Sequence, residues 1–170
     1  MKNNNYAFID WQNLYQWISW NLDYKRFRRY LKDKYSITDA YYFLWFKEKE
    51  NVLYEKLQKS WFILIFNEKP EHLKSDKKWN IDVNLTFYAM KKLIKDDFDK
   101  IVLISWDWDY KVLVDYFIEK NKFLKIIAPN KKFVSSLYKH AKHLNQKYFT
   151  FLDNNWLKNK IEYKKKSLRH

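Results

Sequence analysis

The segment from Lys100 to Tyr110 begins as an uninterrupted aliphatic run and ends in two acids, Asp107 and Asp109. A solid run of Ile, Val and Leu is typical of a strand buried on both faces, as in the interior of a parallel sheet. Ligands bind open α/β sheets at the carboxyl ends of the strands, so these acids lie where a functional site is expected. The alternative is that they cap the next helix, and the segment alone leaves both interpretations open.

The same pattern occurs near the N-terminus, where the apolar run Tyr6–Ile9 ends in Asp10. Asn13 follows at the start of a predicted helix, where it can cap the backbone or orient Asp10. Another acid, Asp82, lies in the first turn of a helix predicted over residues 82–94. The helix dipole favours a carboxylate at that position, so capping is the alternative explanation for Asp82 as well.

Strand and helix signals alternate along the chain. From their apolar periodicity, further strands are predicted over residues 37–46, 62–66, 123–128 and 148–151, and helices over 23–31, 52–59, 112–117 and 135–142. Parallel strands need right-handed crossovers, so the alternation predicts an α/β fold, with helices on both faces of a mainly parallel central sheet. Asp10 and Asp107 then lie at the same edge of the sheet, and Asp82 and Asp109 can point toward it.

The 170 residues suit one compact domain. We predict that this domain spans residues 1–153 and that residues 154–170 form a basic C-terminal tail. Residues 67–80 interrupt the alternation with Pro70, several lysines and no apolar cluster. This segment is therefore the predicted substrate-facing loop.

The chain has 34 Lys and Arg against 20 Asp and Glu, a formal net charge of +14. Such an excess favours a polyanionic partner, and charge alone does not choose between nucleic acid and an acidic membrane surface. No apolar stretch is long enough to span a bilayer, and residues 1–5 lack a signal-peptide core, so a cytoplasmic protein is expected. The absence of cysteine excludes disulfides, thiolate catalysis and cysteine-based zinc sites.

The chain contains no glycine and nine tryptophans. At ordinary usage a chain of this length holds roughly a dozen glycines, and an α/β fold uses them in strand-to-helix turns where φ is positive. Several tryptophans stand at expected turns, namely Trp11, Trp61, Trp79, Trp106 and Trp108. We hypothesise that many of these codons are read as glycine in the source organism and were translated here as tryptophan. The alternative is a genuinely tryptophan-rich protein, and the mass of the native protein distinguishes the two.

Three segments resemble motifs of the NYN domain, a ribonuclease-like branch of the PIN superfamily. They are Phe8–Leu14, Lys78–Val83 and Leu103–Tyr110. In that family the first segment reads Asp, Gly, any residue, Asn, and the last reads Ser, Gly, Asp, any residue, Asp. Trp11 and Trp106 stand where the glycines would be. The resemblance covers residues 6–151 and implies a PIN-like three-layer α/β/α sandwich.

The resemblance also implies a metal-dependent endoribonuclease. Carried over by position, the acids that would hold Mg²⁺ or Mn²⁺ are Asp10, Asp82, Asp107 and Asp109, with Asn13 as a supporting catalytic group. Clustered carboxylates repel one another unless a cation joins them, and oxygen ligands select these hard ions. Such ions activate water and stabilise charge on a phosphate under attack.

RNA, or another nucleic acid, is the expected partner, and a homodimer is left open. The predicted substrate-binding residues are Lys77, Lys78, Lys131 and Lys132, with Ser105 as a polar group beside the acids. Lysines hold a phosphate backbone mainly through charge. For each lysine the alternative interpretation is ordinary solvated surface.

Several other functions compete with RNA cleavage. Genuine Trp106 and Trp108 would bracket the acids with bulky rings, so the chain as written would be a folded but impaired nuclease. The first alternative is a non-catalytic nucleic-acid-binding or regulatory NYN module that keeps the fold without cleaving RNA. A haloacid-dehalogenase-like phosphatase requires a second Asp two residues after Asp10, where the chain has Gln12. A P-loop NTPase is excluded because the chain has no glycine loop to surround a phosphate.

Overall fold

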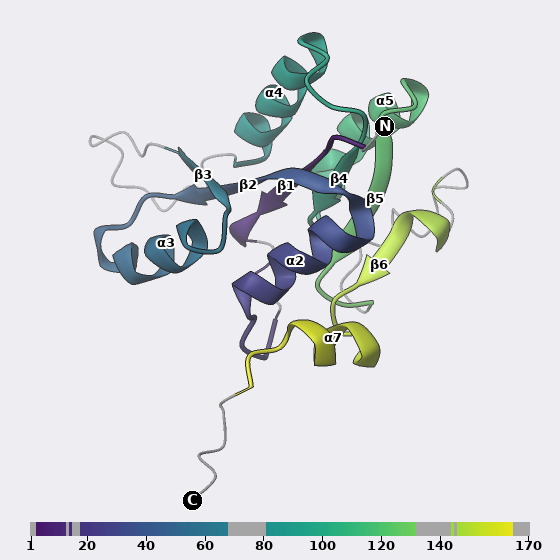
Figure 1. Ribbon diagram of the computed structural model, residues 1–170. Coiled ribbons are helices and arrows are strands. Elements are labelled where there is room, and N and C mark those ends of the chain that lie inside the picture. Colours follow the sequence, from purple (N-terminus) through teal and green to yellow (C-terminus); the bar gives the residue numbers. More distant parts are fainter. Residues whose placement is uncertain are drawn as a thin grey trace, which may run out of the picture.

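The computed structural model describes residues 3–12, 14, 18–67, 81–131, 144 and 146–164. Within these residues six strands form one sheet, in the order β3-β2-β1-β4-β5-β6, and every neighbouring pair is parallel (Figure 1). The strands are β1 (Asn5–Asp10), β2 (Ile37–Trp45), β3 (Ile63–Asn67), β4 (Ile101–Ile104), β5 (Phe123–Ala128) and β6 (Phe149–Phe151). The prediction of an α/β fold with a parallel central sheet is therefore confirmed.

Five α-helices lie in the described part of the chain: α2 (Tyr24–Tyr35), α3 (Asn51–Gln58), α4 (Ile81–Ile94), α5 (Lys111–Glu119) and α7 (Asn155–Ile161). Single 3₁₀ turns precede α3, α5 and β6, namely η1 (Glu48–Glu50), η2 (Trp108–Tyr110) and η3 (Gln146–Tyr148). None of these helices is long and apolar enough to cross a membrane. The helix predicted over residues 135–142 and nearly all of the predicted loop over 67–80 lie outside the described residues.

Alternating side chains of the central strands pack into two cores, one on each face of the sheet. Phe8 of β1 packs with Phe117 and other buried residues of α4 and α5. Its neighbour Ile9 faces the opposite core, with Phe27 of α2 and Leu157 of α7. Residues of α3 complete this second core. The result is the predicted three-layer α/β/α sandwich (Figure 1).

The region predicted as a basic tail begins with a packed helix. Leu157 and Ile161 lie one turn apart on α7 and are buried in the second core. The backbone N–H of Asp23 donates a hydrogen bond of 2.8 Å to the carbonyl of Ile161. In the structure, therefore, residues 154–164 close one face of the domain rather than extend from it.

The sheet grows from β1 in two directions, with β2 and β3 on one side and β4, β5 and β6 on the other. The neighbours β1 and β4 therefore mark the point where the strand order reverses. In open α/β sheets this switch point leaves a crevice outside the carboxyl ends of the two strands. Asp10 is the last residue of β1, and Asp107 follows β4 closely. The predicted acidic edge of the sheet coincides with the switch point.

Left-handed backbone occurs after helices in this fold. The described residues with positive φ are Ser36, Trp61, Asp96 and Asn121, with φ between 52° and 61°, and each lies between a helix and the next strand. Asn and Asp enter this region more readily than other residues with a β-carbon. Trp61 is the outlier, because its side chain is bulky and 73% exposed, so that little packing compensates for the strain.

The other tryptophans at expected turns behave differently. Trp11, Trp106 and Trp108 are described and are not among the residues with positive φ. The expectation of left-handed backbone at the strand-to-helix turns is therefore wrong at these three positions. Trp79 lies outside the described residues. The positive φ of Trp61 therefore supports the hypothesis that glycine belongs at this position. The backbone angles of Trp11, Trp106 and Trp108 neither support nor oppose it.

Candidate metal centre

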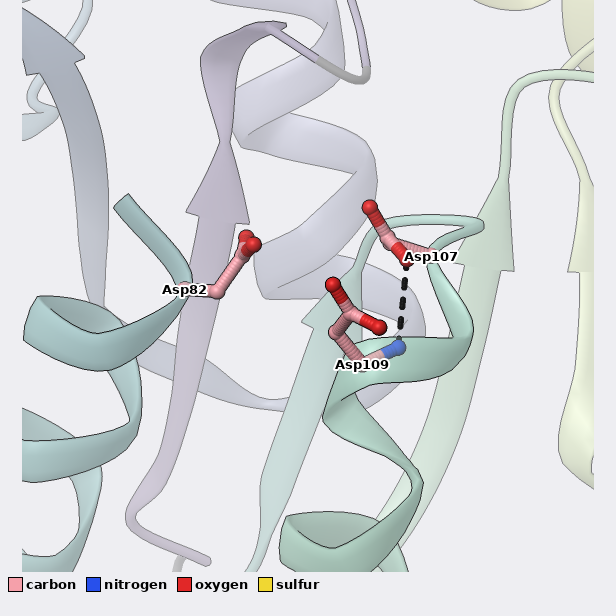
Figure 2. A group of neighbouring side chains, drawn as sticks. All are labelled: Asp82, Asp107 and Asp109. Carbon is pink, nitrogen blue, oxygen red and sulfur yellow. Dashed lines mark hydrogen bonds between the residues drawn. The ribbon is translucent and has the colours of Figure 1, made fainter. Parts of the chain in front are cut away.

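Three carboxylates meet at the switch point. Asp82, Asp107 and Asp109 each offer an oxygen, and these three atoms all lie within 4.8 Å of one another. Figure 2 shows Asp82 reaching from the start of α4 toward the two acids that follow β4. Asp82 and Asp107 are half-buried and Asp109 is exposed. The group is thus open to solvent on one side, where a cation can reach it.

Two hydrogen bonds hold the turn that carries Asp107 and Asp109. The hydroxyl of the buried Ser105 accepts a bond of 3.1 Å from the backbone N–H of Asp107. Asp107 Oδ1 in turn accepts a bond of 3.1 Å from the backbone N–H of Asp109, as the N-cap of η2 (Figure 2). The capping interpretation is therefore confirmed for Asp107. A carboxylate has two oxygens and several lone pairs, so capping does not prevent it from also binding a cation.

Asp82 is the second residue of α4, where the partial positive charge of a helix N-terminus favours a carboxylate. Its neighbour Ile81 is buried in the first core and fixes the start of the helix. Burial raises the pKa of Asp82, and the charges of Asp107 and Asp109 raise it further. Hydrogen bonds with Tyr110 and Asp10 oppose this rise and are outweighed. Negative charge is therefore crowded here, and a bound cation would relieve the crowding.

Asp10 is the most deeply buried of the four predicted acids, with 1% of its surface exposed. Its Oδ2 accepts a hydrogen bond of 3.0 Å from the hydroxyl of Tyr110, which is itself fully buried. Burial raises the pKa of Tyr110, and the Asp10 and Asp82 carboxylates raise it further. The hydroxyl therefore keeps its proton and acts as a donor to Asp10.

The remaining predicted site residues are only partly described. Lys131 is exposed and follows the carboxyl end of β5, so it lies at the same edge of the sheet as the acids. Ser105 is buried, and in this geometry it supports the turn of Asp107. The residues outside the described part of the chain are Asn13, Lys77, Lys78 and Lys132.

The tryptophans beside the acids have apolar partners. Trp106 and Trp108 are half-buried and pack against the core that α4 and α5 cover. The Nζ of Lys111 lies 5.5 Å from the centroid of the Trp108 ring, a cation–π distance. Trp11 packs against the opposite core, with its ring centroid 5.7 Å from that of Tyr42.

A hollow that the sequence analysis did not predict opens at the same edge. Its lining residues are Trp11, Gln12, Leu44, Trp45, Lys47, Glu50 and Tyr54. They come from the segment after β1, from the end of β2 and from the residues that lead into α3. The sequence carries little signal for such a hollow, because it forms only when these separate segments meet.

The comparisons with known proteins agree with this architecture. The model of the NYN domain family matches residues 6–146. No curated protein gives a significant sequence match.

Among solved structures, a protein of unknown function from Vibrio parahaemolyticus is similar, with a TM-score of 0.70 and 20% identity over 90% of this chain and 95% of that one. That likeness shows a shared fold. A glucose-6-phosphate dehydrogenase in complex with glucose-6-phosphate matches 89% of this chain and 37% of its own at 9% identity, and its TM-score of 0.41 is too low to indicate a common fold.

Proposed function

This chain belongs to the NYN domain family, and on that premise we propose that it is a metal-dependent ribonuclease that hydrolyses RNA phosphodiesters. One observation carries the proposal. Three carboxylates from two separate segments, the start of α4 and the turn after β4, offer oxygens within 4.8 Å of one another at the switch point of a parallel sheet. Helix capping favours Asp82 and Asp107 individually, but bringing three negative charges together costs stability because like charges repel, and the arrangement suits a cation-binding site.

Mg²⁺ or Mn²⁺ fits the donor set. Within the described part of the chain the group consists of carboxylate oxygens alone, and oxygen ligands favour hard cations. Asp82, Asp107 and Asp109 would hold the ion, with Asp10 as the buried fourth acid of the set. When bound, such an ion supplies an activated water and offsets the charge that develops on the phosphate.

The chain's own residues have distinct tasks in this proposal. Asp109 is exposed and presents its carboxylate to the side from which substrate arrives. Ser105 holds the Asp107 backbone and keeps the turn in shape. Lys131 would bind the RNA backbone, and the net charge of +14 would attract it. Asn13 as a supporting group and Lys77, Lys78 and Lys132 as phosphate ligands remain predictions.

A cleavage assay tests the proposal. Labelled single-stranded RNA is incubated with wild type, Asp107→Asn and the control Asp33→Asn, each with Mn²⁺ and with chelator. Asp33 is exposed near the end of α2, at the opposite edge of the sheet. We expect cleavage by wild type and Asp33→Asn that requires Mn²⁺, and none by Asp107→Asn. Equal cleavage in every arm would reveal a contaminating nuclease and remove support for the proposal.

A non-catalytic nucleic-acid-binding module is the second candidate, favoured by the indole rings of Trp106 and Trp108 beside the acids. It predicts RNA binding that survives Asp107→Asn and is indifferent to Mg²⁺. The same assay on a version with glycine at positions 11, 106 and 108 separates two explanations of weak cleavage. Activity that appears only with glycine would identify a nuclease impaired by its tryptophans.

A further inference from the structure

Tyr110 joins the segments that carry the acids. It is the last residue of η2 and directly follows Asp109. Its hydroxyl donates to Oδ2 of Asp10, a residue 100 positions earlier in the chain and at the end of a different strand. Both side chains are buried, at 0% and 1% exposure. Breaking this bond would leave a buried carboxylate without that donor, which is costly in a low-dielectric interior.

Tyr110 also influences Asp82: its hydroxyl opposes the rise that burial causes in the pKa of Asp82, and the Asp82 carboxylate adds to the rise that burial causes in the pKa of Tyr110. Tyrosine has only one proton to donate. In the structure that proton goes to Asp10. Asp82 instead offers an oxygen that lies within 4.8 Å of oxygens of Asp107 and Asp109.

We propose that Tyr110 is a positioning residue of the metal centre, whose hydroxyl holds the Asp10 carboxylate in one orientation and thereby sets the affinity for a divalent cation. The inference rests on the proposed function. A metal site depends on the hydrogen-bond partners that orient its acids, and the loss of one such partner costs about 10–100-fold in affinity. Without the hydroxyl, the Asp10 carboxylate would be able to rotate, and this change would weaken the negative field at the cation.

The ring and the hydroxyl of Tyr110 have separable roles. The ring packs in the first core with residues such as Leu113 and Phe117. Tyr110→Phe keeps that ring and removes the oxygen alone. The matched control is Tyr116→Phe on α5, since the Tyr116 side chain is 37% exposed and lies outside the acidic group.

The test is a calorimetric titration of each protein with Mn²⁺, after circular dichroism has verified that each is folded at the titration temperature. Tyr110→Phe is expected to bind Mn²⁺ about 10–100-fold more weakly than wild type, and Tyr116→Phe equally well. An unchanged dissociation constant for Tyr110→Phe overturns the inference and leaves the proposed function standing. Failure of wild type itself to bind Mn²⁺ refutes the proposed function instead.

Asp10→Asn provides a second route to the same answer. If Tyr110 acts through Asp10, adding Tyr110→Phe to Asp10→Asn weakens Mn²⁺ binding no further, because the interaction is already lost. A structural role of the hydroxyl predicts instead that the two losses add. Additive losses would therefore overturn the inference even if Tyr110→Phe alone binds weakly.

Discussion

The guanidinium of Arg28 donates a hydrogen bond of 3.1 Å from Nε to the carbonyl oxygen of Trp61. A second bond of 3.1 Å runs from its Nη1 to the carbonyl of Ile37. Helix α2 thus holds the turn between α3 and β3, and in that turn Trp61 has a φ of 61°. The shape of the turn is imposed by its surroundings, whereas the residue there is poorly suited to it.

Replacing Trp61 with glycine should therefore stabilise the protein. A residue with a β-carbon loses about 1–2 kcal/mol in the left-handed region, and glycine avoids this cost while losing some chain entropy on folding. We expect Trp61→Gly to raise the free energy of unfolding by about 1 kcal/mol, measured by urea denaturation.

The matched control is Trp156→Gly, because Trp156 is also exposed but lies within helix α7. There glycine should lower the free energy of unfolding by about 0.5–1 kcal/mol. A loss of stability at both positions would contradict the argument. The hypothesis that the codon for residue 61 is read as glycine in the source organism also predicts that Trp61→Gly raises the free energy of unfolding.

Asp82→Asn should stabilise the metal-free protein at neutral pH. The pKa of Asp82 is raised in the fold above its ordinary value of 3.8. The folded protein therefore loses stability as the pH rises from that ordinary pKa through the raised one, because Asp82 must then carry its charge in an unfavourable place. In chelator, the melting temperature of Asp82→Asn should exceed that of wild type at neutral pH, and the difference should disappear in acid. Excess Mn²⁺ should reverse the order, because only wild type keeps the ligand. If wild type melts at a higher temperature than Asp82→Asn in chelator at neutral pH, the claim that negative charge is crowded around Asp82 is wrong.

Ser105→Ala should weaken metal binding without removing a ligand. The change leaves the Asp107 N–H without its hydroxyl partner, so we expect a loss of about 1 kcal/mol in stability and about tenfold weaker Mn²⁺ binding by calorimetry. Ser60→Ala is the control, because the Ser60 hydroxyl is also buried and donates a bond of 2.7 Å to the Lys56 carbonyl, away from the acids. It should lose similar stability and no Mn²⁺ affinity. Equal Mn²⁺ affinities for Ser105→Ala and Ser60→Ala would show that Ser105 stabilises the fold and does not affect metal binding.

Lys131→Gln should reduce the salt dependence of RNA binding. Each phosphate contact to a single strand contributes about 0.7 to the slope of log K against log salt concentration, so the slope should become shallower by about that amount. Lys95→Gln is the control, since Lys95 is exposed in the turn between α4 and β4, at the opposite edge of the sheet. Fluorescence anisotropy with labelled RNA measures both. The same slope for both variants would mean that Lys131 does not contact phosphate.

The sequence predicts the parts of this fold that depend on local pattern. The aliphatic run over Ile101–Ile104 identifies a buried strand because every residue in it is apolar, and the acids after it follow from the polarity of parallel sheets. The approach of Asp82 to Asp107 was likewise predictable, because Asp107 follows the end of a strand and Asp82 lies at the start of a helix. In a parallel α/β sheet, strand ends and helix starts lie at the same edge, so the order of the elements along the chain is enough for this inference.

Interactions between distant segments were beyond the sequence. Tyr110 has the pattern of a core aromatic, and nothing in the chain indicates that its hydroxyl meets Asp10. The packing of α7 was missed because its charged residues mask the spacing of Leu157 and Ile161. The position of the left-handed turns depends on how each helix ends, which apolar periodicity does not encode.

The most direct test of the account is anomalous diffraction at the manganese edge from crystals of the protein grown with Mn²⁺. We predict a peak about 2–2.6 Å from carboxylate oxygens of Asp82, Asp107 and Asp109. A lysine or arginine side chain seated among the three acids, with no peak there at saturating Mn²⁺, would contradict it.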